Sequence, residues 1–295
     1  MEEYLILPLV SFILAFFMAP AGVSGAFLLL PFQMSVLGFT TPNVSSTNLV
    51  YNLLAIPSGV YRYTVEKRMA WPLVLIVISG TLPGVFLGAV LRVHLFLDPK
   101  LFKLFVGCVL LYLASRIAFS VVKPDIRIRK IDRKFGEAKE GLLSAGIPGD
   151  AVVRNVSVSF REIVYEFWGE KFSFSPIIAL AVSFVVGVVG GIYGIGGGAI
   201  LAPFFVSFFG LPTYTIAGAN LMGTFLTSVV GVVSYSYLGY PPDFTTGILF
   251  GIGGFFGLYF GARFQRYMPE RLIRLILFVV VIFTALRYIT QFFMS

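Results

Sequence analysis

The chain of 295 residues is 58% hydrophobic and only 12% charged, and its 22 basic and 14 acidic residues give a formal net charge of +8. Soluble domains carry about twice this share of charged residues, so the composition excludes an ordinary soluble protein and predicts a polytopic protein embedded in the lipid bilayer. The sequence lacks a basic surface interleaved with aromatic residues, so it does not indicate a nucleic-acid partner. The single cysteine and single histidine predict neither a disulfide within the chain nor a metal or cofactor site.

Eight apolar runs follow one another along the chain. They cover residues 5–37, 44–63, 71–92, 101–121, 176–209, 214–238, 245–262 and 272–293. A helix needs about 20 residues to cross the bilayer, and the first and fifth runs are clearly longer than that. We therefore predict an N-terminal membrane repeat over 1–121, a polar central loop over 122–175 and a C-terminal membrane repeat over 176–295.

A glycine-rich break interrupts each of the two long runs. The breaks read Gly22-Val23-Ser24-Gly25-Ala26 and Gly194-Ile195-Gly196-Gly197-Gly198. Residues Gly22, Gly25, Pro31 and Asn48 align with Gly194, Gly197, Pro203 and Asn220 at a constant offset of 172 residues. Glycine lets the backbone leave helical geometry, and such backbone is tolerated at membrane depth where protein buries it or where it lines a cavity. The paired breaks predict a discontinuous or re-entrant helix in each half, at the binding site of a transporter.

The orientation of the two halves depends on whether each long run crosses the membrane once or dips in and returns. If it returns, the halves are inverted, and 18 lysines and arginines lie on one side against 4 on the other. If it crosses once, the halves are parallel and the division is 15 against 7. Because basic residues collect on the cytoplasmic side, the count favours inverted repeats in an all-α fold. Each repeat is then a glycine-broken helix plus three transmembrane helices, and both arrangements place the central loop in the cytoplasm of a cell-membrane protein.

The central loop contains ten basic and eight acidic residues. Apolar residues recur at roughly helical spacing over 129–144, and apolar and polar residues alternate over 156–160 and 172–175. This pattern predicts a short helix followed by a β-hairpin around Gly169. The other interpretation is a solvated linker.

Polar side chains follow each break inside the next apolar run. Asn48 follows the first break, and Asn220 and Thr224 follow the second, four residues apart on one helical face. Uncharged donors in a helix bundle suit either the binding of an oxyanion or hydrogen bonds between membrane helices. Tyr193 abuts the second break and is a further candidate for contact with a substrate. Most of the other tyrosines in or at the ends of the spans should belong to the interfacial aromatic belts.

All acidic residues lie outside the apolar runs. Cation transporters and proton relays usually place carboxylates inside the membrane, so their absence disfavours a metal cation as substrate. A helix that restarts after a break presents free N–H groups and the positive end of its dipole, which makes an anion site without a formal charge. The spans contain no carboxylate pair, His/Cys set or nucleophile–base pair, so we do not expect an enzyme.

The glycine-rich motif, Gly194-x-Gly196-Gly197-Gly198 followed by Pro203 in a duplicated chain with a polar central loop, resembles the sulfite exporter TauE/SafE family, also called toluene-sulfonate uptake permeases. The resemblance covers nearly the whole chain. It implies transport of a small sulfur-containing anion, such as sulfite, thiosulfate, sulfoacetate or another organosulfonate, coupled to protons or to the membrane potential. Carried over by position, the family's glycine-rich segment is 194–198 and its equivalent is 22–26, where Ser24 and Ala26 replace glycines.

The sequence therefore predicts a secondary transporter that works by alternating access. The residues that we expect to bind the anion are Gly22, Ser24, Gly25, Asn48, Tyr193, Gly194, Gly196, Gly197, Gly198, Asn220 and Thr224. The alternatives are an anion channel or passive permease that uses the same site, and a membrane scaffold or sensor that acts through the central loop.

Overall fold

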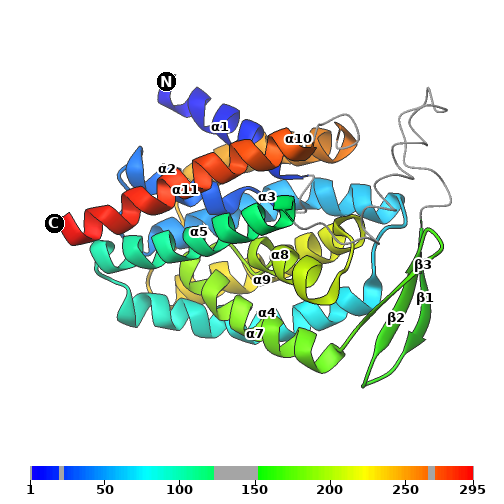
Figure 1. The fold of residues 1–295 in the computed structure, drawn as a ribbon. Coiled ribbons are helices and arrows are strands. Elements are labelled where there is room, and N and C mark those ends of the chain that lie inside the picture. Colours follow the sequence, from blue (N-terminus) through cyan, green and yellow to red (C-terminus); the bar gives the residue numbers. More distant parts are fainter. Residues whose placement is uncertain (1, 20–22, 123–151, 265–269, 295) are drawn as a thin grey trace.

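The computed structural model describes residues 2–19, 23–122, 152–264 and 270–294, and this part of the chain is mostly helical (Figure 1). The helices of the first half are α1 (Glu2–Met18), α2 (Ala26–Ser35), α3 (Asn43–Val65), α4 (Trp71–Leu95) and α5 (Pro99–Val122). Three strands follow, β1 (Val153–Val158), β2 (Ile163–Phe167) and β3 (Glu170–Phe174). The helices of the second half are α7 (Pro176–Tyr193), α8 (Gly198–Phe209), α9 (Thr213–Tyr237), α10 (Phe244–Phe264) and α11 (Glu270–Met294).

Four of the described helices, α4, α7, α9 and α10, are long and apolar enough to cross a membrane. Their ends follow from local chemistry. α4 and α7 each have a proline in the first turn. An N–H group at this position has no acceptor within the helix, so proline, which lacks one, costs no hydrogen bond there. α7 ends at Gly194, which adopts a left-handed conformation with φ 84°, and α8 ends in the same way at Gly210. Glycine closes a helix in this conformation without the steric cost that a Cβ would bring.

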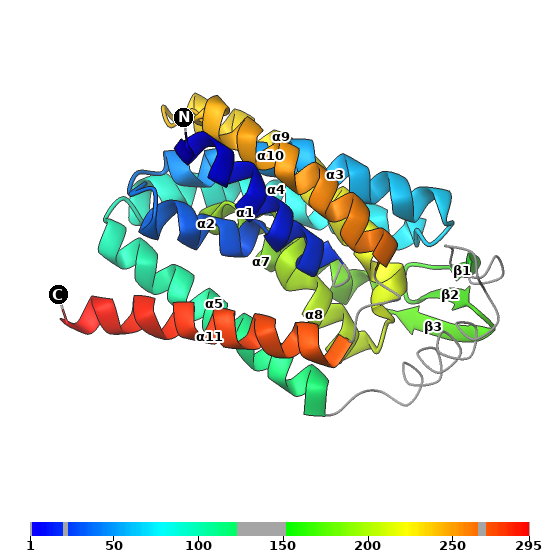
Figure 2. The same ribbon diagram turned by 90° about the horizontal axis from the view of Figure 1, so that it is seen from above.

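The helices pack as a long bundle in which elements of the two halves alternate. α1 lies along α10, α7 lies along α4, and α3 packs against α9. α5 and α11 lie side by side along one flank (Figure 2). Small residues allow the closest approaches, since a Cβ added to Gly84 of α4 would come within 2.9 Å of the Cα of Gly187 in α7. The contact between α10 and α1 is similarly close, with Gly257 against Ala15. Backbones that approach so closely are typical of helix packing in membranes.

A three-stranded antiparallel sheet in the order β1-β2-β3 lies at one end of the bundle, whereas α1 begins and α11 ends at the opposite end (Figures 1 and 2). A turn at Gly169 joins β2 to β3, and β1 adds a third strand to this hairpin. The sheet docks on the helices through the Val153 N–H, which donates to the Lys67 carbonyl at 3.0 Å, and through Tyr165, which is hydrogen-bonded to Thr215 at 2.8 Å. Burial raises the pKa of Tyr165, and the hydrogen bond opposes that rise. The helix expected within 129–144 lies outside the described residues.

Candidate functional site

The two helix interruptions lie at the expected positions in the chain. α2 begins after Gly25, which has φ 88°, and α8 begins after a segment in which Gly194 and Gly196 have φ 84° and 69°. Gly197 precedes α8 with ordinary helical angles. A Cβ on Gly194 would lie 2.5 Å from the Cα of Ser45, so this glycine is required both by its backbone angles and by the neighbouring helix. Gly22 lies outside the described residues.

Asn48 joins the two interruptions. Its side chain is fully buried, and its Nδ2 group donates to the carbonyl of Ala26 at 3.0 Å and to the carbonyl of Gly194 at 2.8 Å. Its Oδ1 atom accepts a hydrogen bond from Gln33 Nε2 at 3.1 Å. Both donor hydrogens therefore bind backbone carbonyls, so in this conformation the amide cross-links the start of α2 to the end of α7.

Other side chains of α3 hold the second break as well. Ser45 Oγ donates to the Tyr193 carbonyl at 3.2 Å, and Asn52 Nδ2 donates to the Ile195 carbonyl at 3.1 Å. Tyr193 is fully buried, and its hydroxyl donates to the carbonyl of Phe27, in the first turn of α2, at 2.7 Å. Tyr193 thus connects the two breaks through its own hydrogen bond.

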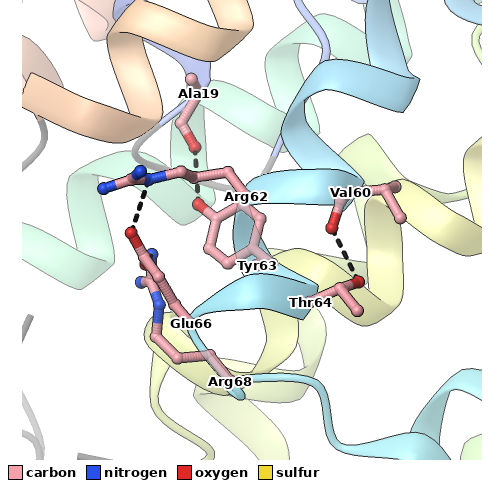
Figure 3. A network of polar contacts seen from close by, with 7 residues as sticks. All are labelled: Ala19, Val60, Arg62, Tyr63, Thr64, Glu66 and Arg68. Atoms are coloured by element: carbon pink, nitrogen blue, oxygen red, sulfur yellow. Dashed lines mark hydrogen bonds and ion pairs between the residues drawn. The ribbon is translucent and has the colours of Figure 1, made fainter. Parts of the chain in front are cut away.

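Three of the tyrosines in the apolar runs are buried inside the bundle, so the expectation of interfacial belts is wrong for Tyr51, Tyr63 and Tyr235. The Tyr51 hydroxyl donates to the Ser24 carbonyl. Tyr63 and Tyr235, which align at the offset of 172, donate to the carbonyls that precede the two breaks: Tyr63 to Ala19 at 3.2 Å, visible in Figure 3, and Tyr235 to Gly191 at 2.7 Å. Hydropathy alone misses them because a tyrosine near a helix end fits either location.

Around the start of α8 the side chains come from α9. Thr224 Oγ1 accepts a hydrogen bond from the Gly198 N–H at 3.0 Å and donates to the Asn220 carbonyl at 2.8 Å. A Cβ on Gly196 would lie 2.7 Å from Thr224 Cγ2, and a Cβ on Gly198 would lie 2.7 Å from the Asn220 carbonyl oxygen. The glycine segment therefore lies directly on the face of α9 that carries Asn220 and Thr224.

The amide of Asn220 differs from that of Asn48 in its hydrogen bonds. Asn220 is fully buried, and neither its Nδ2 nor its Oδ1 atom has a hydrogen-bond partner among the described residues. Buried polar groups almost always have partners in native proteins, and an unpaired one costs about 1–3 kcal/mol. Near Asn48 the unpaired buried atoms, Gln33 Oε1 and Asn52 Oδ1, are acceptors, which do not attract an anion. The unpaired Nδ2 of Asn220 is a donor.

Asn48 and Asn220 lie at different levels of the bundle. A Cβ on Gly59 would contact Leu221, and one on Gly231 would contact Leu49, so α3 and α9 run antiparallel. The level of Leu221 therefore corresponds to Gly59 on α3, ten residues beyond Leu49. At a rise of 1.5 Å per residue this separates the two asparagines by about 15 Å along the helices, and one small anion cannot contact both. This corrects the expectation of a single site that contains both amides.

The starts of α2 and α8 remain electropositive. Neither helix has an acidic residue in its first turn, so nothing there neutralises the positive end of the helix dipole. Ser24 lies at the start of α2, with its Oγ atom 3.4 Å from the Ala26 N–H. In the described part of the chain no three His, Cys, Asp or Glu side chains come together as metal ligands. The arrangement suits an anion that is bound without a metal ion, by backbone N–H groups and a side-chain amide.

Comparison with known proteins gives two matches over most of the chain. The family described as "Sulfite exporter TauE/SafE" matches residues 7–288, a range that includes both breaks. The "Probable membrane transporter protein YunE" of Bacillus subtilis (strain 168) is 24% identical over 268 residues, which cover 88% of each protein. No solved structure matches the chain.

Proposed function

Because the chain belongs to the sulfite exporter TauE/SafE family, we propose that it carries a small sulfur-containing oxyanion across the cell membrane by alternating access. Membership of this family and the likeness to a membrane transporter make it a multi-pass membrane transporter and not an enzyme. The substrates that we propose are sulfite, thiosulfate, sulfoacetate or another organosulfonate, with transport coupled to protons or to the membrane potential.

The observation that carries the proposal is the unpaired amide of Asn220 beside the start of α8. An oxyanion at this point would accept a hydrogen bond from Asn220 Nδ2 and face the first N–H groups of α8. Gly196 and Gly198 let the start of α8 pack closely on the face of α9 that carries Asn220, since a Cβ at either position would lie 2.7 Å or less from an atom of α9. Thr224 fixes this backbone through its bond to Gly198.

The remaining predicted site residues would hold the two breaks in position. Asn48, Tyr193 and Gly194 take part in hydrogen bonds that join the breaks. The carbonyl of Ser24 accepts the Tyr51 hydroxyl. Any motion of one half against the other would have to break some of these bonds, so we propose that they stabilise one end state of the transport cycle.

We propose further that the membrane parts, 1–121 and 176–295, are inverted repeats. Their equivalent helices α3 and α9 pack antiparallel through contacts that exchange under the offset of 172, Gly59 with Leu221 and Gly231 with Leu49. The packing of α1 on α10 is likewise the counterpart of α7 on α4. A two-fold axis between α3 and α9 would produce both exchanges. The basic residues of the central loop would then place it, with its sheet, in the cytoplasm.

The test is counterflow of labelled sulfite in proteoliposomes that contain the purified protein. We expect wild type to accumulate label transiently against its gradient, which a channel cannot do. Asn220→Leu should fold and lose uptake, and Gly197→Leu, where a Cβ would already lie 2.7 Å from Thr81 Cγ2, is compared only as folded protein. Asn43→Leu is the matched control, because it removes an amide at the first residue of α3 that binds the Pro241 carbonyl. Folded Asn220→Leu and Gly197→Leu proteins that transport sulfite at the wild-type rate would refute the site.

The same assay separates the scaffold alternative. A protein that lacks residues 125–170 should keep part of its sulfite flux if transport belongs to the helices. A scaffold that acts through the loop would give a different result. The deletion would abolish the binding of a partner, and Asn220→Leu and Gly197→Leu would keep the wild-type sulfite flux.

A further inference from the structure

Arg92 is a buried cation near the end of α4. Its side chain is fully buried, its Nη1 group donates to the Phe96 carbonyl, and its guanidinium lies over the Phe102 ring at 3.6 Å from the centroid. Its Nε and Nη2 atoms have no hydrogen-bond partner among the described residues. Because α4 starts beside the sheet and has 25 residues, Arg92 lies toward the opposite end of the bundle.

The two unpaired atoms form one edge of the guanidinium. Nε–H and one N–H of Nη2 point in parallel from the planar group, and this edge binds two oxygens of a carboxylate or a similar oxyanion. A buried charge without a partner is strongly unfavourable, and the ring of Phe102 and one carbonyl leave this edge uncompensated. The free edge of Arg92 therefore fits an oxyanion that offers two oxygen acceptors.

The carboxylates of Asp98 and Asp243, which lie at this end of the bundle, are engaged elsewhere. Asp98 Oδ1 accepts the Lys100 N–H at 2.8 Å, and Asp243 accepts the N–H and the hydroxyl of Thr246 at 3.1 and 2.9 Å. Each caps the helix that follows it, as acidic residues commonly do. Both ion pairs found in the described part of the chain involve Glu66, and neither reaches Arg92.

A second fully buried arginine, Arg68, has its charge balanced within the protein. It lies over the ring of Tyr63 at 4.5 Å and pairs with Glu66, which also pairs with Arg62 Nε at 2.6 Å (Figure 3). Its Nε and Nη1 atoms have no hydrogen-bond partner among the described residues, but Glu66 supplies the opposite charge. Arg68 is next to the sheet, since the adjacent Lys67 carbonyl binds β1. In the described part of the chain no ion pair joins a carboxylate to Arg92.

We propose that the Nε–Nη2 edge of Arg92 binds a small oxyanion of the same class as the substrate, at the end of the bundle opposite the sheet. This inference rests on the proposed function, and it adds a second anion site that the substrate occupies on its way to or from Asn220. An anionic lipid headgroup has the same chemistry, but the full burial of the guanidinium inside the helix bundle favours a free ion.

The test measures sulfite binding to the purified full-length protein in detergent, through the sulfite dependence of its thermal unfolding. Asn220→Leu should keep part of the sulfite-induced stabilisation, because Arg92 still binds the ion. Adding Arg92→Gln to this variant should weaken the remaining binding about 10- to 100-fold, the loss expected for hydrogen bonds to a charged group. Lys103→Gln is the matched control, since it removes one positive charge from neighbouring α5, and it should change the affinity less than about twofold.

The outcomes separate the two proposals. If Asn220→Leu alone abolishes binding, the Arg92 site is refuted and the proposed function stands. If Asn220→Leu binds as wild type does and Arg92→Gln abolishes binding, the Arg92 site stands and the Asn220 site is refuted. If the Asn220→Leu protein responds to added phosphatidylglycerol and not to sulfite, and Arg92→Gln removes that response, the edge binds lipid and the proposal fails.

A conservative variant covers the case in which Arg92→Gln does not fold. Arg92→Lys keeps the charge and removes the two-donor edge, so it should bind sulfite about tenfold more weakly in the Asn220→Leu background. Binding equal to that of the arginine protein would overturn the proposal.

Discussion

Replacing Asn48 and Asn220 by leucine makes the same chemical change at two aligned positions, and we expect opposite results. Asn48→Leu leaves the carbonyls of Ala26 and Gly194 and the Nε2 group of Gln33 buried without their present partner. Each such loss costs about 1–3 kcal/mol, so the free energy of unfolding should fall by about 3–9 kcal/mol. Asn220→Leu removes two polar atoms that have no partner among the described residues, so stability should be unchanged or rise by about 1–2 kcal/mol.

The assay is thermal unfolding of both variants in the same detergent, followed by sulfite titration of the folded protein. Asn48→Leu should melt about 10 °C or more below wild type, whereas Asn220→Leu should melt at or above the wild-type temperature and lose part of the sulfite-induced stabilisation. Equal destabilisation by the two substitutions would refute the reasoning, because it would mean that Asn220 is also held by hydrogen bonds. Full sulfite response in Asn220→Leu would refute its role in binding.

Two further predictions concern the glycine break and the sheet. Gly194 and Gly239 both have positive φ, but a Cβ meets Ser45 at Gly194 and nothing within 4 Å at Gly239. Gly239→Ala should therefore cost about 1–2 kcal/mol of left-handed strain and keep transport. Gly194→Ala should cost about 1–3 kcal/mol more and reduce sulfite uptake. Equal effects of the two substitutions in thermal unfolding and counterflow would contradict this. Burial raises the pKa of Tyr165, so its contribution to stability is complete below the unfolded value of about 10 and is lost as pH rises above it. Proteolysis of the sheet should accelerate above pH 10 in wild type and less in Tyr165→Phe, and identical pH profiles would exclude this tyrosine as the cause.

The membrane class and the interruptions were predictable from the sequence because they depend on local properties. A helix is the structure that satisfies its own backbone hydrogen bonds in lipid, so long apolar runs such as 71–92 and 214–238 predict helices, and α4 and α9 cover them. Glycines in the middle of such a run indicate where the backbone departs from the helix. The glycine-rich segment 194–198 also carries the resemblance to the family, which the match over residues 7–288 confirms.

The hydrogen-bond partners were not predictable in the same way. In a membrane helix the lipid-facing side is as apolar as the packed side, so hydropathy does not reveal which face points inward. For this reason Tyr51, Tyr63 and Tyr235 looked like belt residues and are buried donors. Arg92 is the last residue of the apolar run 71–92, where an arginine can reach the membrane surface, and its burial against Phe102 depends on the fold of the α4–α5 turn.

The alignment of the two halves explains part of the difference between the hydrogen bonds of Asn48 and those of Asn220. Gln33, which donates to Asn48, aligns at the offset of 172 with Phe205, and a phenylalanine cannot bind an amide in this way. The second half therefore lacks the side chain that completes the amide of the first. The hydrogen bonds of Asn48 hold the two breaks together, whereas substrate binding needs an amide donor that is not already engaged. One asparagine cannot do both at once. Phe205 leaves Asn220 Oδ1 without the donor that Gln33 gives to Asn48 Oδ1, and Asn220 Nδ2 has no partner among the described residues, so we expect the anion at the amide of the second half.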